Sequence, residues 1–141
     1  MKNNCYLHND ITSKIISAFY RVYNTLGFGF LEKVYENAIA IELLIDGLNI
    51  KTQRSIKVYY KGKAVGFYVA DIIVNDYVIV EIKSAEAICE EHEAQLLNYL
   101  KATDIEVGLL LNFGKRTQIK RKVYSEEFKP QAIKKPSMSE T

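Results

Sequence analysis

Residues 69–87 read VADIIVNDYVIVEIKSAEA, and this stretch decides the fold. Two apolar, β-branched runs, 72–74 and 77–82, are joined by the turn-forming pair Asn75-Asp76. This composition is typical of buried strands, and so short a turn makes them antiparallel neighbours. Asp71 leads into the first run and Glu81 stands near the end of the second, so the pairing brings both carboxylates to the same end. The sequence therefore predicts a buried hairpin with two acids at the same end of its strands.

The segments on either side of this hairpin show their own spacings of apolar residues, which predict further helices and strands. Upstream, Asp10 can cap a helix that Gly27 ends, and a second helix is expected over 31–46. Its inward residues would be Leu31, Val34, Tyr35, Ala38, Ile39 and Leu43. The turn KGK at 61–63 joins two alternating stretches into a hairpin. Downstream, the pattern predicts a helix over 87–102 and strands over 107–112 and 118–124.

This order of elements predicts an α/β fold. An antiparallel meander followed by a strand–helix–strand crossover gives one mixed central β-sheet flanked by α-helices, with an N-terminal helical pair. The length of 141 residues fits a single domain, which we assign to 1–125. We expect the basic tail 126–141, with Pro130 and Pro136, to be disordered.

The composition is that of a soluble globular protein, with 48% hydrophobic and 26% charged residues. The longest apolar runs are too short to cross a bilayer, and the N-terminus lacks the apolar region of a secretory signal. Cys5 and Cys89 have no CxxC partner, so we interpret them as free thiols in a reducing cytosol. We therefore expect a cytoplasmic protein without a membrane partner.

The charge of the chain is unevenly distributed. From Gly114 onward, eight lysines and arginines stand against three acids, beginning with Lys115 and Arg116. Such a segment can hold phosphates by a salt-sensitive contact. It can equally be a solubilising end of the chain, and charge alone leaves both interpretations open.

The two acids of the hairpin indicate a cation site. Asp71 and Glu81 repel each other unless a cation lies between them, and magnesium prefers carboxylate oxygens. Lys83 lies two residues beyond Glu81 and so projects from the same strand face. Its ammonium could stabilise charge that develops on a phosphate. Strand ends often carry such residues, however, so this pattern alone does not distinguish a site from solubilising charges.

Two further groups of polar residues, one on each predicted helix that flanks the hairpin, could join this candidate cation site. Glu32 and Tyr35 share a face of the second helix, although Glu32 could simply favour the helix dipole. Gln95 and Tyr99 share a face of the later helix with His92. A glutamine there could orient Lys83 or bond a phosphate oxygen.

The motifs Asp71…Glu81-Ile82-Lys83 and Gln95-x-x-x-Tyr99, in this order, resemble the PD-(D/E)XK nuclease superfamily, in its branch with a RecB-like QxxxY helix. The stretch GFLEKVY, residues 29–35, resembles the signature of the GxxExxY protein family within that superfamily. The similarity covers roughly 11–124. Ala70 stands where the superfamily has proline, a residue that does no chemistry.

The resemblance implies a restriction-endonuclease-like fold and a nuclease that depends on Mg (or Mn) and hydrolyses phosphodiester bonds in DNA. Asp71, Glu81, the backbone carbonyl of Ile82 and Glu32 would hold the metal. Lys83 would assist the attacking water, with Gln95 beside it. The supporting or substrate-binding residues would be Tyr35, Tyr99, Lys115 and Arg116.

Two alternatives stay open. The same fold could be a catalytically inert module that binds nucleic acid or a protein, although such a module has no need of two adjacent carboxylates. The chain could also have an assembly role, as a homodimer through the second helix.

Overall fold

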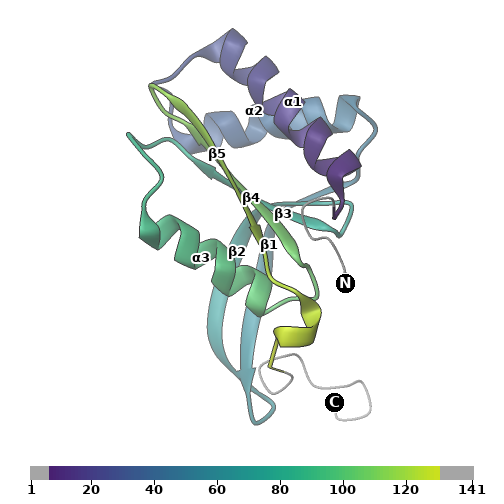
Figure 1. The fold of residues 1–141 in the computed structure, drawn as a ribbon. Helices are drawn as coiled ribbons and strands as arrows, with labels where there is room; N and C mark the ends of the chain where they lie inside the picture. Colours follow the sequence, from purple (N-terminus) through teal and green to yellow (C-terminus); the bar gives the residue numbers. More distant parts are fainter. Residues whose placement is uncertain (1–6, 131–141) are drawn as a thin grey trace.

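The computed structural model describes residues 7–130, whose centre is a five-stranded mixed β-sheet (Figure 1). The strands lie side by side in chain order: β1 (Ile50–Tyr60), β2 (Lys63–Val74), β3 (Val78–Lys83), β4 (Val107–Phe113) and β5 (Thr117–Val123). Only β3 and β4 are parallel. A parallel pair needs a crossover, which α3 (Glu90–Lys101) supplies. The predicted α/β fold is confirmed, except that residues expected in two separate strands form the single strand β2.

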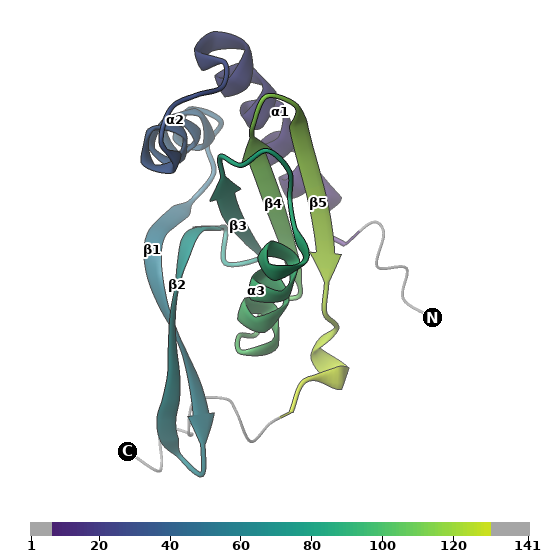
Figure 2. The same ribbon diagram turned by 90° about the vertical axis from the view of Figure 1, so that its left-hand side faces the viewer.

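Helices cover both faces of the sheet. The N-terminal pair α1 (Asn9–Leu26) and α2 (Glu32–Ile45) lies on one face and α3 on the other (Figure 2). Alternate residues of the central strands point to opposite faces, so two separate cores form. The first joins α1 and α2 to Ile72, Val80 and Leu109, and the second joins α3 to Ile79 and Leu110. Because both faces of β3 are covered, any polar side chain on it must find a partner.

Two details of the helices differ from the sequence prediction. The N-cap residue of α1 is His8, and Asp10 lies in the first turn, where its charge still favours the helix dipole. Leu31 and Val34 are 81% and 39% exposed although both were expected to face inward. Three of the other residues predicted to face inward are confirmed as buried, and these are Tyr35, Ile39 and Leu43, spaced four residues apart.

The segment after β5 is partly structured. Residues expected to be disordered from 126 onward begin with the 3₁₀ helix Glu126–Phe128. The buried ammonium of Lys129 donates to the carbonyls of Thr103 and Ile105, at 2.8 and 2.6 Å, which fixes this turn beside the end of α3. The rest of the expected tail, 131–141, and Cys5 lie outside the described residues.

Within residues 7–130, no helix is long and apolar enough to cross a membrane. Cys89 is an exposed free thiol.

Candidate active site

Asp71 and Glu81 meet where β2 and β3 separate. Ile72 and Val80 form the last pair of the ladder at this end. Beyond it, the amide of Asp71 donates to Oε2 of Glu81, and the amide of Ile82 donates to Oδ2 of Asp71, both at 2.8 Å. Each carboxylate thus takes the place of a backbone carbonyl of the ladder. These crossed bonds hold the two acids side by side and leave Oδ1 and Oε1 as the ligand atoms available to a cation.

The surroundings disfavour a second negative charge on this pair. Glu81 is only 3% exposed, and burial, together with the charge of Asp71, raises its pKa to about 8. Burial also raises the pKa of the Asp71 carboxyl, against the lowering effect of the hydrogen bond from Ile82. A bound cation would reverse this effect by favouring both ionised carboxylates.

Lys83 and Gln95 lie together beside this pair. The ammonium of Lys83 donates to Oε1 of Gln95 at 3.2 Å, and its charge acts to lower the pKa values of both Asp71 and Glu81. Since Gln95 projects from α3 and Lys83 from β3, the contact joins the helix to the end of the strand. An ammonium fixed beside two carboxylates is a positive charge available to an anionic substrate.

Tyr99, one turn after Gln95 on α3, is buried beneath the acids. Its ring lies 5.5 Å from that of Tyr68 on β2. Burial and the charges of Glu81 and Asp71 raise the pKa of its phenol to about 12. Tyr99 therefore stays protonated at neutral pH and packs α3 against the site.

Glu32 and Tyr35 occupy different positions near the site. Glu32 accepts a hydrogen bond from the amide of Ser84 at 3.3 Å, just beyond the end of β3. Tyr35 is buried, and its hydroxyl donates to the carbonyl of Gly27 at 2.7 Å. Tyr35 therefore supports the α1–α2 loop that presents Glu32.

Glu36 is a site acid that the sequence analysis did not single out. It is 5% exposed and accepts from Lys33 and Gln53 at 2.9 and 2.8 Å. Its charge is also among the causes that raise the pKa values of Asp71 and Glu81. Glu36 could have been identified from the sequence by its position, because it is an acid on the inward side of the predicted helix, directly after Tyr35.

The donor set suits magnesium better than a softer metal. Two carboxylates and a strand-end carbonyl are hard oxygen ligands. Among residues 7–130, no three His, Cys, Asp or Glu side chains are gathered closely enough to form a metal cluster by themselves. The expectation that Glu32 joins Asp71 and Glu81 around one ion stays a prediction.

A hydrogen-bonded loop closes the site on the side of β4. The buried Asn112, in register with Lys83, accepts from the amide of Ala85 at 2.9 Å and donates to its carbonyl at 3.0 Å. Gly114 passes so close that a Cβ placed on it would lie 2.2 Å from the oxygen of Ala85. Only glycine fits there without moving the loop that follows Lys83.

Gly114→Ala is accordingly expected to destabilise the fold by about 2 kcal/mol or more, because backbone must move to relieve the clash. Urea unfolding followed by circular dichroism measures this. Gly27→Ala is the comparison for a glycine whose added Cβ has open space, where only its positive φ of 66° carries a cost. Equal stability of Gly114→Ala and wild type would contradict the close approach.

The turn between β4 and β5 carries Lys115 and Arg116, both exposed. The hydroxyl of Tyr23 lies 3.0 Å from the carbonyls of Gly114 and Lys115, so α1 supports this turn. Because β3 and β4 run parallel, the turn lies at the same edge of the sheet as Lys83. Within residues 7–130, neither cation forms an ion pair.

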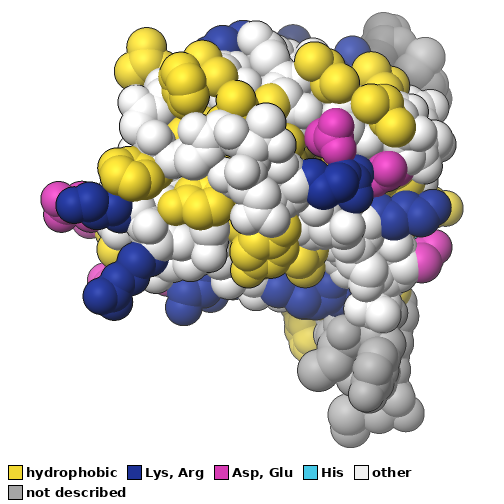
Figure 3. Space-filling view, turned by 90° about the horizontal axis from the view of Figure 1, so that it is seen from above, with side chains coloured by type: hydrophobic (Ala, Val, Ile, Leu, Met, Phe, Trp, Pro, Cys, Tyr) yellow, Lys and Arg dark blue, Asp and Glu magenta, His cyan; other side chains and the backbone are white. Residues whose placement is uncertain are grey.

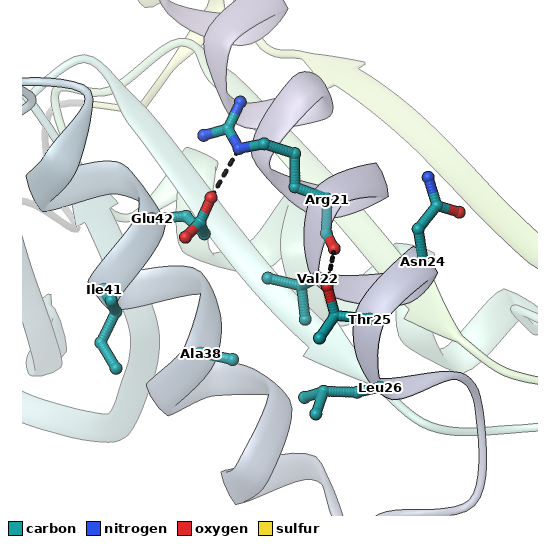
Figure 4. Close-up of a pocket in the computed structure, with 8 residues that line it drawn as sticks. All are labelled: Arg21, Val22, Asn24, Thr25, Leu26, Ala38, Ile41 and Glu42. Atoms are coloured by element: carbon teal, nitrogen blue, oxygen red, sulfur yellow. Dashed lines mark hydrogen bonds and ion pairs between the residues drawn. The ribbon is translucent and has the colours of Figure 1, made fainter.

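A groove of about 560 Å³ lies elsewhere, between α1 and α2 (Figure 4). Val22 and Leu26 of α1 and Ala38 of α2 form its apolar floor, and Arg21 bonds Glu42 across it. It contains none of the site residues, so it is a feature of the helical surface.

Comparisons with known proteins agree with the fold. The model of a family described as the PD-(D/E)XK nuclease superfamily matches residues 9–122. No curated protein sequence gives a significant match. Among solved structures, the chain is similar to one titled "Crystal structure of SSO0001", with a TM-score of 0.53 and 20% identity. That similarity covers 66% of this chain and 50% of SSO0001, so the chain spans about half the length of that protein.

Proposed function

This chain belongs to the PD-(D/E)XK nuclease superfamily, and we propose that it is an active nuclease that hydrolyses phosphodiester bonds in DNA with Mg²⁺ or Mn²⁺. The observation that carries the proposal is the crossed pair of Asp71 and Glu81 with the ammonium of Lys83 beside it. We also propose the finer placement in the GxxExxY family, on the motif of residues 29–35, and a cytoplasmic location.

The residues of the site have separate tasks in this reaction. Asp71, Glu81 and the carbonyl of Ile82 would hold the ion, with Glu32 reaching it directly or through water. When bound, Mg²⁺ supplies charge neutralisation at the phosphate and lowers the pKa of water. Lys83 places a positive charge next to the scissile phosphate.

Three further residues assist Lys83, one by positioning it and two by contacting the substrate. Gln95 holds the ammonium of Lys83 in one orientation through the 3.2 Å bond. Lys115 and Arg116 offer charge to the phosphates that flank the scissile one. Lys83 is thus the catalytic residue, and Gln95 is a positioning residue.

Incubation of the purified protein with labelled single-stranded, duplex and branched DNA and with RNA tests the proposal. We expect cleavage of DNA with Mg²⁺ or Mn²⁺ and none with EDTA. Absence of cleavage on every substrate with both metals would contradict it.

The inert binding module is the other candidate. In that case Asp71 and Glu81 have no ion to hold. Calorimetric titration with Mg²⁺ and Mn²⁺ separates the two, because only the nuclease requires affinity for the metal at this pair.

We further propose that the protein forms a homodimer through α2. Four apolar side chains form a stripe along its outer side, and these are Leu31, Val34, Ile41 and Ile45, which are 81%, 39%, 59% and 72% exposed. The side of the molecule that carries α1 and α2 shows several groups of exposed hydrophobic side chains (Figure 3). The stripe exposes roughly 400 Å² of apolar surface, which is the size of the largest apolar patch on a typical monomer and is often functional, and about half of what one partner of a standard interface buries.

The stripe is close to self-complementary. Leu31 and Ile45 lie seven residues before and after Ala38, and Val34 and Ile41 lie four before and three after. A two-fold axis near Ala38 would set each large side chain opposite another, as an isologous interface requires. The small Ala38 permits close approach, and antiparallel helices oppose unlike ends of their dipoles.

Ile41→Lys is expected to convert the dimer into a monomer of 16.2 kDa, because a charge cannot be buried unpaired in the interface. Light scattering after size exclusion measures the mass. Leu44→Lys is the matched control: Leu44 is 58% exposed but lies about 100° round the helix from Ile45, so it should leave the dimer intact. A monomeric wild type, or equal effects of both lysines, would contradict the interface.

A further inference from the structure

The part of the β1–β2 hairpin that precedes Asp71 carries only positive charge. Between Asp46 and Asp71 the chain has five lysines and arginines and no acid. These are Lys51, Arg54, Lys57, Lys61 and Lys63. Figure 2 shows this hairpin extending well beyond the other strands, at the end of the molecule opposite α1. Residues 51–69 are called the arm below.

Most of these cations are not used by the fold. Lys51 bonds Asp76 at 2.8 Å. The other four are exposed, and none of them forms an ion pair with another residue of the described range 7–130. Two cations of β5 differ in this respect, since Lys122 pairs with Glu93 and Arg121 donates to the carbonyl of Leu7 at 2.7 Å. The arm therefore gathers four exposed cations that have no ion pair in the described range.

One face of the arm also exposes apolar side chains. Val65, Phe67 and Val69 alternate along β2 and are 61%, 67% and 48% exposed. The other face turns toward α3, where Tyr68 packs on Tyr99. In the ladder Lys57 stands opposite Phe67, and Tyr60 at the tip is 59% exposed. Exposed rings among unpaired lysines can hold both bases and phosphates of a strand.

The arm leads directly into the candidate active site. The exposed positions Val65, Phe67 and Val69 of β2 are followed two residues later by the half-buried Asp71. At the strand rise of about 3.3 Å per residue, Phe67 lies roughly 13 Å from Asp71 and Lys63 roughly 26 Å. A nucleic-acid strand lying along the arm would therefore span a few nucleotides before it reaches the two carboxylates.

We propose that the arm binds a single-stranded segment of nucleic acid and guides it to Asp71 and Glu81. Lys57, Lys61 and Lys63 contact phosphates, and Phe67 and Tyr60 stack on unpaired bases. Charge complementarity with a polyanion selects nucleic acid as the occupant, and the apolar row selects unpaired bases, which alone offer their faces. The inference rests on the proposed function, since it names the substrate form of that site.

Fluorescence anisotropy tests this proposal. The ligands are a fluorescein-labelled 20-nucleotide single strand and the duplex of the same sequence, and binding is measured in EDTA at several salt concentrations. The variant Lys61→Ala/Lys63→Ala should bind the single strand about 10-fold more weakly, with a salt slope smaller by about 1.4. Phe67→Ser should weaken single-strand binding by about 10-fold with an unchanged salt slope.

Lys14→Glu is the matched control. It removes the same two units of charge from an exposed position on α1, remote from the arm, and should bind within about twofold of wild type. Equal melting temperatures by circular dichroism confirm that each variant folds.

Because binding is measured without metal, the arm and the nuclease activity are judged separately. Loss of binding in the arm variants supports the arm even if the protein cuts nothing. Wild-type affinity of the lysine variant, or no binding of the single strand by wild type, overturns the proposal even if DNA is cleaved. Tighter binding of the duplex with no effect of Phe67→Ser also overturns it.

Discussion

Lys83→Ala is expected to lower the rate of DNA cleavage at saturating Mg²⁺ by about 10³-fold while the affinity for DNA changes by no more than a few-fold. The ammonium of Lys83 is the positive charge that lies beside Asp71 and Glu81 and bonds Gln95. Its loss removes stabilisation of charge that develops in the transition state, whereas ground-state binding depends on many other cations. Single-turnover cleavage with enzyme in excess measures the chemical step.

Two companion variants sharpen this result. Lys83→Arg keeps the charge but replaces a compact ammonium with a planar guanidinium, so we expect it to restore only a small part of the rate. Gln95→Ala leaves Lys83 in place without its partner and should cost about 10-fold. A Lys83→Ala enzyme that cleaves within 10-fold of wild type would contradict the role of the lysine.

Glu81→Gln is expected to abolish cleavage and yet to stabilise the metal-free protein at high pH. The carboxyl of Glu81 has its pKa raised from 4.5 to about 8, mainly by burial and then by Asp71. Between these two values the folded protein holds a proton that the unfolded chain has lost. Raising the pH through this range therefore favours unfolding, and above about 8 the whole effect is present.

The glutamine cannot ionise and still offers an oxygen to the amide of Asp71. The free energy of unfolding of the variant should consequently match that of wild type near pH 4.5 and exceed it at pH 9 by on the order of 5 kcal/mol, since the pKa shift from 4.5 to about 8 is worth about 1.4 kcal/mol per unit. Urea unfolding in EDTA at both pH values measures this. Mn²⁺ should then stabilise wild type and leave the variant unchanged. A variant less stable than wild type at pH 9 would contradict the raised pKa.

The hairpin at the centre of the site could be predicted because its signals are local. The β-branched runs, the Asn75-Asp76 turn and the two-residue period place Asp71 opposite Glu81 without knowledge of the rest of the chain. Gln95 could be placed near Lys83 for a similar reason, because a strand–helix–strand crossover returns the helix across the end of its strand.

Other features depend on packing that one sequence does not encode locally. Glu36 is buried because Lys33 and Gln53 bond it, and Gln53 comes from a strand that begins after α2 has ended. Leu31 and Val34 fit a helical period as well as Tyr35 and Ile39 do, and only contact with the sheet decides which stripe is buried. The cations of the arm are scattered in sequence, and the hairpin gathers them on one extension.

The central claim is that Asp71 and Glu81 hold a divalent cation, and a crystal structure of the protein soaked with Mn²⁺ tests it most directly. The account predicts an anomalous peak within about 2.3 Å of a carboxylate oxygen of each residue and of the carbonyl of Ile82. It also predicts that this peak disappears in Asp71→Asn. A well-ordered site with the crossed bonds intact and no Mn²⁺ between the two carboxylates at saturating concentration would contradict it.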